Sequence, residues 1–327
     1  MTQDAPENDR TVGAPASAER SLLSLSGWGE RRGRVRGAVL LALTALVLGL
    51  LLARFDAEAV GRALARLPAE AWLGAAALTA LLPLTMTTRW HIVLGATGVA
   101  VPWRRCFVIM LGVHPISVVS PARLGDALRA YGLRRRGAGA TALGGIVAER
   151  ALDIAVLALA AALAGLSQGR GEVALLAGLV VLVLVAVLAL TGRADRLPLR
   201  AGWRGALGRF AGAADVFRRR PGVLAAATGI TLLHWALTML LVTLLLRGVG
   251  ADVGLVQVTA AMPIAIFVGL LPITFAGIGT RDAALAVLLA GQAAPAEALA
   301  AGLLYTLFTY FFLALAGLPL TRRGLDL

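Results

Sequence analysis

Three short clusters of arginine and carboxylate side chains lie in or beside apolar stretches of the chain. Guanidinium groups bind phosphate and carboxylate groups, and carboxylates can balance their charge or transfer protons. Because ionisable groups within apolar sequence indicate a functional site by default, we expect these clusters to form a substrate-binding site, with no catalytic and no metal-ligating residue. The candidate binding residues are Arg123, Asp126, Arg129, Glu149, Arg150, Asp153, Gly277, Gly279, Arg281 and Asp282.

The first cluster follows a proline. Pro121 is expected to begin a half-helix, and the N–H groups of its first turn carry partial positive charge that suits a phosphate or carboxylate. Arg123 adds a charge of the same sign, and Asp126 can pair with Arg129 at i,i+3. The alternative is a cytoplasmic loop with solvated charges.

The second cluster lies near the middle of a long apolar run. Glu149 and Asp153 are four residues apart and share a helix face, while Arg150 precedes Asp153 by three residues. Two carboxylates and one guanidinium at membrane depth are expected to face the interior of a helix bundle. The alternatives are a buried ion pair that fixes helix packing and a protonated carboxylate that permits proton coupling.

The third cluster places Arg281 and Asp282 in an otherwise uncharged stretch. An arginine at membrane depth costs about 2.5–3.5 kcal/mol, so it needs a partner or an aqueous cavity. Asp282 points about 100° away on a helix and is not expected to be the only partner. Gly277 and Gly279 allow the backbone to approach a ligand closely. The alternative is an interfacial turn from which Arg281 reaches water.

The chain that carries these clusters is too apolar for a soluble domain. Of its 327 residues, 59% are hydrophobic and 15% charged, whereas soluble domains are about a quarter charged. The mean hydropathy of +0.82 predicts an all-α polytopic membrane protein. This excludes Rossmann and TIM-barrel enzymes, secreted disulfide scaffolds and disordered tails. The single cysteine, Cys106, excludes an internal disulfide.

Six apolar runs are long enough to cross the membrane as helices, which takes about 17–25 residues. They are residues 37–53, 71–88, 138–166, 173–192, 222–246 and 298–320. Two further apolar segments, residues 106–131 and 253–290, are interrupted by proline and glycine, which end helices. We expect these two to be broken, re-entrant hairpins.

The distribution of arginines predicts whether each broken segment crosses the membrane or returns to the side from which it entered. The net charge is +13, and every basic residue is an arginine. The arginines gather between apolar runs, which is the positive-inside pattern and argues against nucleic-acid binding. With two hairpins, 24 arginines lie on the cytoplasmic side, Arg89 and Arg129 among them, and five lie outside. Arg150 and Arg281 remain at membrane depth. Both termini are therefore predicted to be cytoplasmic.

This threading predicts the domain organisation. A polar, basic N-terminal segment, a single transmembrane domain and a short cytoplasmic tail occupy residues 1–36, 37–320 and 321–327. Each half of the domain contains two spans, a hairpin and one span, and the halves have opposite orientations.

The two halves are expected to form an inverted repeat. They cover about residues 37–166 and 173–320, and a basic cytoplasmic loop lies at 193–220. The segment 121–127 is similar to 277–283, with a helix breaker five residues before an aspartate in both. Paired broken segments at matching positions point to a transporter's binding site.

The three motifs, in this order, resemble the flippase-like transmembrane domain of lysylphosphatidylglycerol synthases over about residues 37–320. The motifs are Pro121-x-Arg123-x-Gly125-Asp126-x-x-Arg129, Glu149-Arg150-x-x-Asp153, and Leu271-Pro272 followed by Gly277-Ile278-Gly279-x-Arg281-Asp282. The family usually has glutamate where this chain has Asp126 and Asp282. The sequence ends at Leu327 without the soluble aminoacyl-transferring domain, so lysyl transfer by this polypeptide is not expected.

The resemblance implies an integral lipid flippase of the bacterial inner membrane that moves a phospholipid or a lipid-linked headgroup between leaflets. Arg123 and Arg281 are expected to contact phosphate, and the carboxylates to balance their charge. No cofactor is expected, and no phosphate-binding loop for ATP is present.

Three other functions remain open. The first is a membrane-embedded transferase with Asp126 or Glu149 as general base. The second is a non-transporting subunit that docks a separate synthase or glycosyltransferase through residues 193–220. The third is a small-solute or ion transporter.

Overall fold

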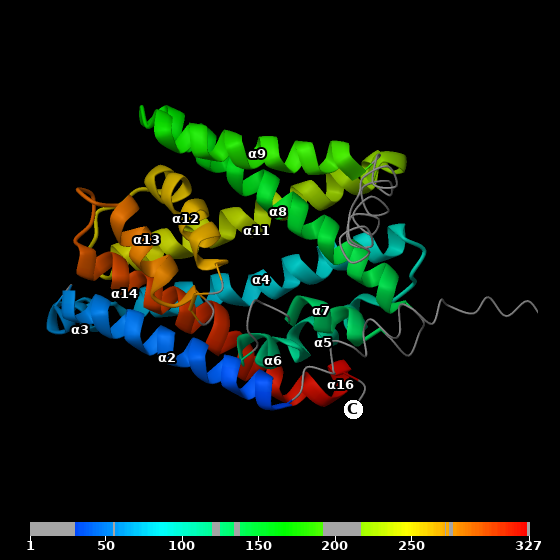
Figure 1. Cartoon of the computed structure of the whole chain (residues 1–327), viewed down its shortest axis with the longest axis horizontal. Coiled ribbons are helices and arrows are strands. Elements are labelled where there is room, and N and C mark those ends of the chain that lie inside the picture. The colour runs from blue at the N-terminus through cyan, green and yellow to red at the C-terminus, as the bar shows by residue number, and fades with distance from the viewer. Residues whose placement is uncertain are drawn as a thin grey trace, which may run out of the picture.

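The computed structural model describes residues 30–54, 56–119, 125–133, 138–191, 217–271, 273–274 and 277–325. These residues are helical and include no strand (Figure 1). This follows from the apolar sequence, because a helix satisfies its own backbone hydrogen bonds where no water is available.

The first half of the chain contains α2 to α8, and the second contains α9 to α16. The bounds are α2 (Glu30–Arg54), α3 (Ala57–Ala65), α4 (Ala69–Ala96), α5 (Trp103–Gly112), α6 (His114–Val119), α7 (Gly125–Tyr131), α8 (Gly139–Ser167), α9 (Gly171–Thr191), α11 (Pro221–Gly248), α12 (Leu255–Gly269), α13 (Thr280–Leu288), α14 (Pro295–Thr306), the π-helix η5 (Leu307–Phe312), α15 (Leu313–Gly317), the short helix η6 (Leu318–Leu320) and α16 (Thr321–Leu325).

Three helices among the described residues are long and apolar enough to cross a membrane. They are α4, α11 and the continuous helical stretch Pro295–Leu325. The outward surfaces of the helices are rich in large apolar side chains, such as Leu163 on α8 and Leu175 on α9. Such a surface is suited to lipid, and we describe the chain as a membrane protein.

The second broken segment doubles back. Gly269 at the end of α12 lies against Arg281 near the start of α13. At the other end of the pair, the turn between α8 and α9 reaches both helices: Gln168 bonds the carbonyl of Val256, and Arg170 bonds the carbonyl of Leu288. The segment therefore enters and leaves at the same end of the molecule.

The first broken segment also returns toward its start. Helix α5 packs against α16 and α6, and α7 packs against α6 and α8. Gly132, just after α7, lies against Ile109 of α5 and against Gly324 of α16. This segment opens at the opposite end of the molecule from α12 and α13 (Figure 1). The two hairpins thus approach the middle of the bundle from opposite ends.

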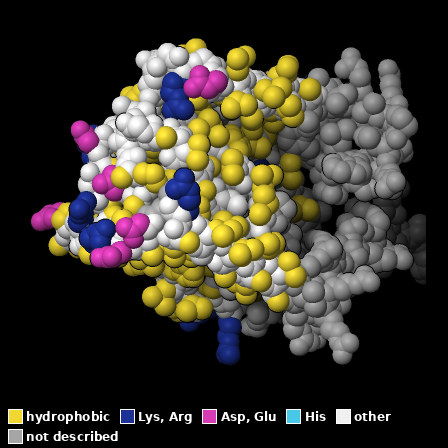
Figure 2. Space-filling view, turned by 60° about the vertical axis from the view of Figure 1, so that its left-hand side comes forward, with side chains coloured by type: hydrophobic (Ala, Val, Ile, Leu, Met, Phe, Trp, Pro, Cys, Tyr) yellow, Lys and Arg dark blue, Asp and Glu magenta, His cyan; other side chains and the backbone are white. Residues whose placement is uncertain are grey.

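The two ends of the bundle differ in charge. The end at the α3–α4, α8–α9 and α13–α14 turns, which we call the mixed-charge end, carries both signs side by side (Figure 2). There Arg66 lies 3.9 Å from Glu297, and Arg170 lies 3.3 Å from Glu172.

The opposite end, which we call the basic end, carries arginines. They include Arg104, Arg105, Arg218, Arg219, Arg220, Arg322 and Arg323. Arg105 bonds the carbonyl of Arg323, which holds α16 against α5.

Helix α2 begins at Glu30, so it includes the end of the polar, basic segment 1–36. One sequence expectation needs correction. Arg89 and Arg129 were assigned to the cytoplasmic side, but both side chains are buried, with exposed fractions of 2% and 1%. Helix α4 continues to Ala96, so the charge of Arg89 lies within the helix and does not end it.

Candidate functional site

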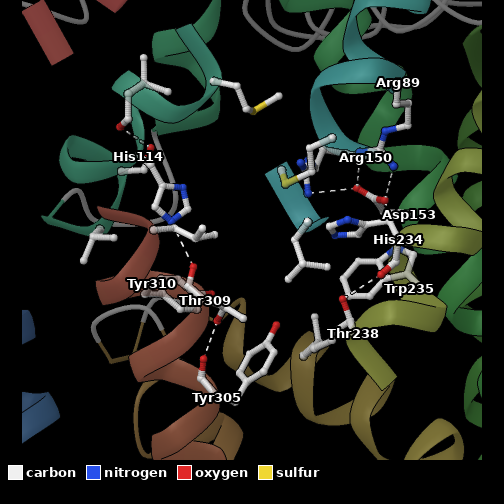
Figure 3. A pocket seen from close by; sticks show the side chains of 18 of the residues that line it. Arg89, His114, Arg150, Asp153, His234, Trp235, Thr238, Tyr305, Thr309 and Tyr310 are labelled. Carbon is white, nitrogen blue, oxygen red and sulfur yellow. Dashed lines mark hydrogen bonds and ion pairs between the residues drawn. The ribbon is translucent and has the colours of Figure 1, made fainter. Parts of the chain in front are cut away.

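A cavity of about 150 Å³ lies in the middle of the bundle, where two hydrophobic clusters meet. Figure 3 shows His114 and Thr309 on one side of it and Arg150, Asp153, His234 and Trp235 on the other. Both broken segments contribute to the wall. The polar side chains that line it are Arg89, His114, Ser117, Arg129, Arg150, Asp153, His234, Trp235, Thr238, Arg281, Tyr305, Thr309 and Tyr310.

A bidentate ion pair joins α4 to α8 at the wall of the cavity. Arg89 Nη1 donates to Asp153 Oδ1 at 2.6 Å, and Nη2 donates to Oδ2 at 3.2 Å. Nη1 also donates to the hydroxyl of Thr231 on α11 at 2.9 Å. Parallel N–H···O bonds fix the guanidinium plane, so Arg89 ties three helices together.

Two further donors complete the hydrogen bonding of Asp153. Arg150 Nη1 lies 3.0 Å from Oδ2, and Trp235 Nε1 donates to Oδ1 at 3.0 Å. Each carboxylate oxygen therefore has two donors. A carboxylate oxygen has two lone pairs, so Asp153 is saturated.

Behind this pair lies Glu149, whose side chain is 0% exposed. Its Oε2 accepts from Arg129 Nη1 at 3.0 Å, and its Oε1 lies 3.6 Å from Arg89 Nε. The Arg129 guanidinium also lies over the ring of Trp90, 5.4 Å from its centroid. As expected, both carboxylates of the second motif face the bundle interior.

Arg281 and Asp282 form a second group at the start of α13. Arg281 Nε and Nη2 both donate to Asp282 Oδ1, at 2.9 and 2.5 Å. Nη2 also donates to the Gly302 carbonyl at 3.0 Å and to Thr306 Oγ1 at 2.6 Å. The adjacent aspartate is thus a partner, but, as expected, not the only one.

The backbone around this group depends on two glycines. Gly279 has a φ of 88°, which disfavours residues with a Cβ, and its N–H donates to Asp282 Oδ2 at 3.0 Å. A Cβ at Gly302 would lie 2.5 Å from Asp282 Oδ1. Close packing of α14 on α13 therefore lets the Gly302 carbonyl reach Arg281.

A π-helix borders the cavity opposite the ion pairs. In η5, Thr309 presents its carbonyl to His114 Nε2 at 3.1 Å. A carbonyl only accepts hydrogen bonds, so His114 Nε2 carries the proton. Single π-helical turns within α-helices are frequent at functional sites.

His234 is held in the same way. The hydroxyl of Thr85 lies 2.8 Å from the Leu82 carbonyl and 2.8 Å from His234 Nδ1. When this hydroxyl donates to the carbonyl, Nδ1 is the donor to Thr85. His234 is thus hydrogen-bonded to Thr85, and its ring also packs edge-on against that of Trp235.

The structure brings six of the candidate residues to the cavity wall or directly behind it. They are Arg129, Glu149, Arg150, Asp153, Arg281 and Asp282. Gly277 and Gly279 lie at the turn before α13. Arg123 lies outside the described residues, and so does the side chain of Asp126. Among the described residues, no group of histidine, cysteine and carboxylate side chains could hold a metal ion.

Sequence reasoning missed Arg89 as a site residue. Arg89 directly follows the apolar run 71–88, yet Trp90, Ile92 and Val93 continue the apolar pattern beyond it. The turn residues Thr97 and Gly98 were the better signal for the end of the helix.

Comparison with known proteins gives one family. The family model described as the lysylphosphatidylglycerol synthase TM region matches residues 37–317. No curated protein matches the chain.

Proposed function

This chain belongs to the family of the lysylphosphatidylglycerol synthase TM region, and from that premise we propose that it moves a phospholipid or a lipid-linked headgroup between the leaflets of the bacterial cytoplasmic membrane. The observation that carries the proposal is the arginine-lined cavity in the middle of an apolar bundle. Charged side chains within the membrane are rare, and substrate or ion pathways are among the places where they occur.

The size of the cavity suits a headgroup. Pockets that enclose drug-sized ligands measure roughly 300–1,000 Å³, and this one measures about 150 Å³. The acyl chains of a lipid would therefore stay in the bilayer. This avoids the cost of exposing them to water, about 0.8 kcal/mol for each CH₂ group.

The arrangement of the broken segments supports transport. We propose six full spans, namely α2, α4, α8, α9, α11 and the stretch from α14 to η6, with two re-entrant hairpins of opposite orientation. The halves, about residues 37–166 and 173–320, would form an inverted repeat. In such transporters the substrate binds where broken helices of the two repeats meet.

We further propose that the basic end, with both chain termini, faces the cytoplasm, since arginine-rich segments remain on that side. A cysteine placed at Glu58 should then react with a membrane-impermeant maleimide in intact cells. One placed at Arg219 should react only after permeabilisation. Glu58 and Arg219 are exposed at opposite ends, and the native Cys106 is buried, which keeps background labelling low. The reverse labelling pattern would contradict the orientation.

Reconstitution tests the proposed function. Purified protein is placed in vesicles containing fluorescent phosphatidylglycerol or phosphatidylethanolamine, and a membrane-impermeant reductant bleaches the outer leaflet. Protein-dependent bleaching of the inner-leaflet probe, with a rate that depends on the headgroup, is the expected result. Bleaching identical to that of protein-free vesicles, with protein that remains folded, would contradict the proposal.

The geometry argues against Glu149 as the general base of a transferase. A general base must come within hydrogen-bond reach of the substrate, but Glu149 is fully buried, pairs with Arg129 and does not line the cavity. Mass spectrometry of the same vesicles distinguishes the two functions, because a transferase would leave a covalently altered lipid. The docking alternative rests on residues 193–220, most of which lie outside the described residues.

A further inference from the structure

We propose that the cavity binds headgroups through a phosphate group, favours those of net negative charge, and discriminates against headgroups that carry an additional cationic amine. The ligand chemistry is a phosphate ester held between Arg281 of α13 and Arg150 of α8. The inference deepens the proposed function and rests on it only for the identification of the ligand as a lipid.

The first observation is an unused donor in the cavity wall. Arg281 lines the cavity and is 2% exposed. Its Nε and Nη2 bind Asp282, Gly302 and Thr306. Its Nη1 is buried and has no hydrogen-bond partner among the described residues. Leaving a charged donor unsatisfied is costly, so an anionic oxygen that reaches this guanidinium group from the cavity would be bound.

The second observation is that no carboxylate in the described cavity wall is left free to pair with a cation. Asp153 is the one carboxylate among the described residues that line the cavity, and both of its oxygens already have two donors each. Glu149 and Asp282 lie behind arginines. A cationic amine entering the cavity would therefore lose its hydration without gaining an ion pair.

Tyr305 and Trp235 do not offer an alternative binding position for a cation. The Arg281 guanidinium already lies over the ring of Tyr305, 4.7 Å from its centroid. Trp235 directs its N–H at Asp153. A second cation at Tyr305 would face the charge of Arg281 at close range.

Arg150 lies on the opposite side of the proposed phosphate-binding position. It lines the cavity, pairs with Asp153 through Nη1, and its side chain is 33% exposed. Arg150 and Arg281 also belong to opposite halves of the chain. A phosphate between them would bridge the halves by charge-assisted hydrogen bonds.

A binding measurement tests the inference independently of transport. Thermal unfolding of the purified full chain in a nonionic detergent is followed with two short-chain lipids, phosphatidylglycerol and lysylphosphatidylglycerol. A ligand that binds the native state raises the Tm in proportion to ln(1 + [L]/Kd). Because placing like charges together costs several kcal/mol, lysylphosphatidylglycerol should need at least about tenfold higher concentration for the same shift. Equal or tighter binding of lysylphosphatidylglycerol would overturn the inference.

Two variants separate the cavity from the basic end. Arg150→Gln removes one cavity charge, while Asp153 keeps Arg89 as partner, so the fold should survive. We expect it to weaken phosphatidylglycerol binding about tenfold. Arg219→Gln removes the same charge from the exposed basic end and should leave binding unchanged. If Arg219→Gln weakens binding as much as Arg150→Gln does, the lipid binds the surface and the inference fails.

Soluble anions distinguish the source of the phosphate. Glycerol phosphate and inorganic phosphate are added in place of the lipids. Shifts seen only with the short-chain lipid support a lipid headgroup. Shifts of equal size with glycerol phosphate, lost in Arg150→Gln, would keep the anion preference but assign the site to a soluble anion. Failure of lipid translocation together with selective anion binding would contradict the proposed function and leave this inference standing.

Discussion

Replacing Arg89 with glutamine is expected to destabilise the protein by about 3–5 kcal/mol, because it leaves Asp153 and Glu149 buried with less compensating charge. Arg89 bonds both oxygens of Asp153 and also reaches Thr231, so its loss removes the link between α4, α8 and α11. Arg89→Lys should recover only part of the stability, since an ammonium group cannot form the bidentate pair.

Thermal unfolding in detergent measures this effect, and Arg62→Gln is the matched control. Arg62 forms an exposed ion pair with Glu58 at 2.7 Å, and exposed pairs contribute about 0–1 kcal/mol. If Arg89→Gln unfolds at the same temperature as Arg62→Gln, the buried network does not hold the three helices together.

Arg281→Gln is expected to reduce lipid translocation about ten- to a hundredfold. A hydrogen bond to a charged group contributes about 1.5–3 kcal/mol, and each 1.4 kcal/mol corresponds to a factor of ten. Because Arg281 carries the unused donor in the cavity wall, its loss removes the proposed contact with the headgroup phosphate.

Thr306→Val separates this role from a structural one. Thr306 Oγ1 accepts from Arg281 Nη2 at 2.6 Å, so the variant loosens Arg281 but keeps its charge. We expect Thr306→Val to retain most of the translocation that Arg281→Gln loses, at similar Tm. Equal loss of translocation in the two variants would indicate that Arg281 only supports the packing of α13 on α14.

The fold class could be predicted from composition, and the ion pair within α8 from the spacing of its residues. Residues three apart on a helix are neighbours, so the contact of Arg150 with Asp153 follows from the sequence. Proline and glycine predicted that residues 253–290 would break, although α12 continues through Pro263. The arginine distribution predicted that the segment returns. The structure shows the same return through Gln168 and Arg170.

The long-range contacts of the site could not be predicted in this way. Arg89 and Asp153 are 64 residues apart, and His114 and Thr309 are 195 apart. Their meeting depends on how α4, α8 and the C-terminal helices pack, which helical periodicity does not specify. Hydrophobic periodicity also does not predict the π-helix at Leu307–Phe312, because its residues continue the apolar pattern of α14.

Filling the cavity without changing its charge tests the central claim most directly. Ser117 lines the cavity from α6, and a tryptophan there would occupy the space of a headgroup. Leu163→Trp is the matched control, because Leu163 is 61% exposed on the outer face of α8. The measurement is phosphatidylglycerol translocation in vesicles. We predict that Ser117→Trp falls to the protein-free rate while Leu163→Trp keeps the wild-type rate. A folded Ser117→Trp protein that moves lipid as fast as wild type would contradict passage of the headgroup through this cavity.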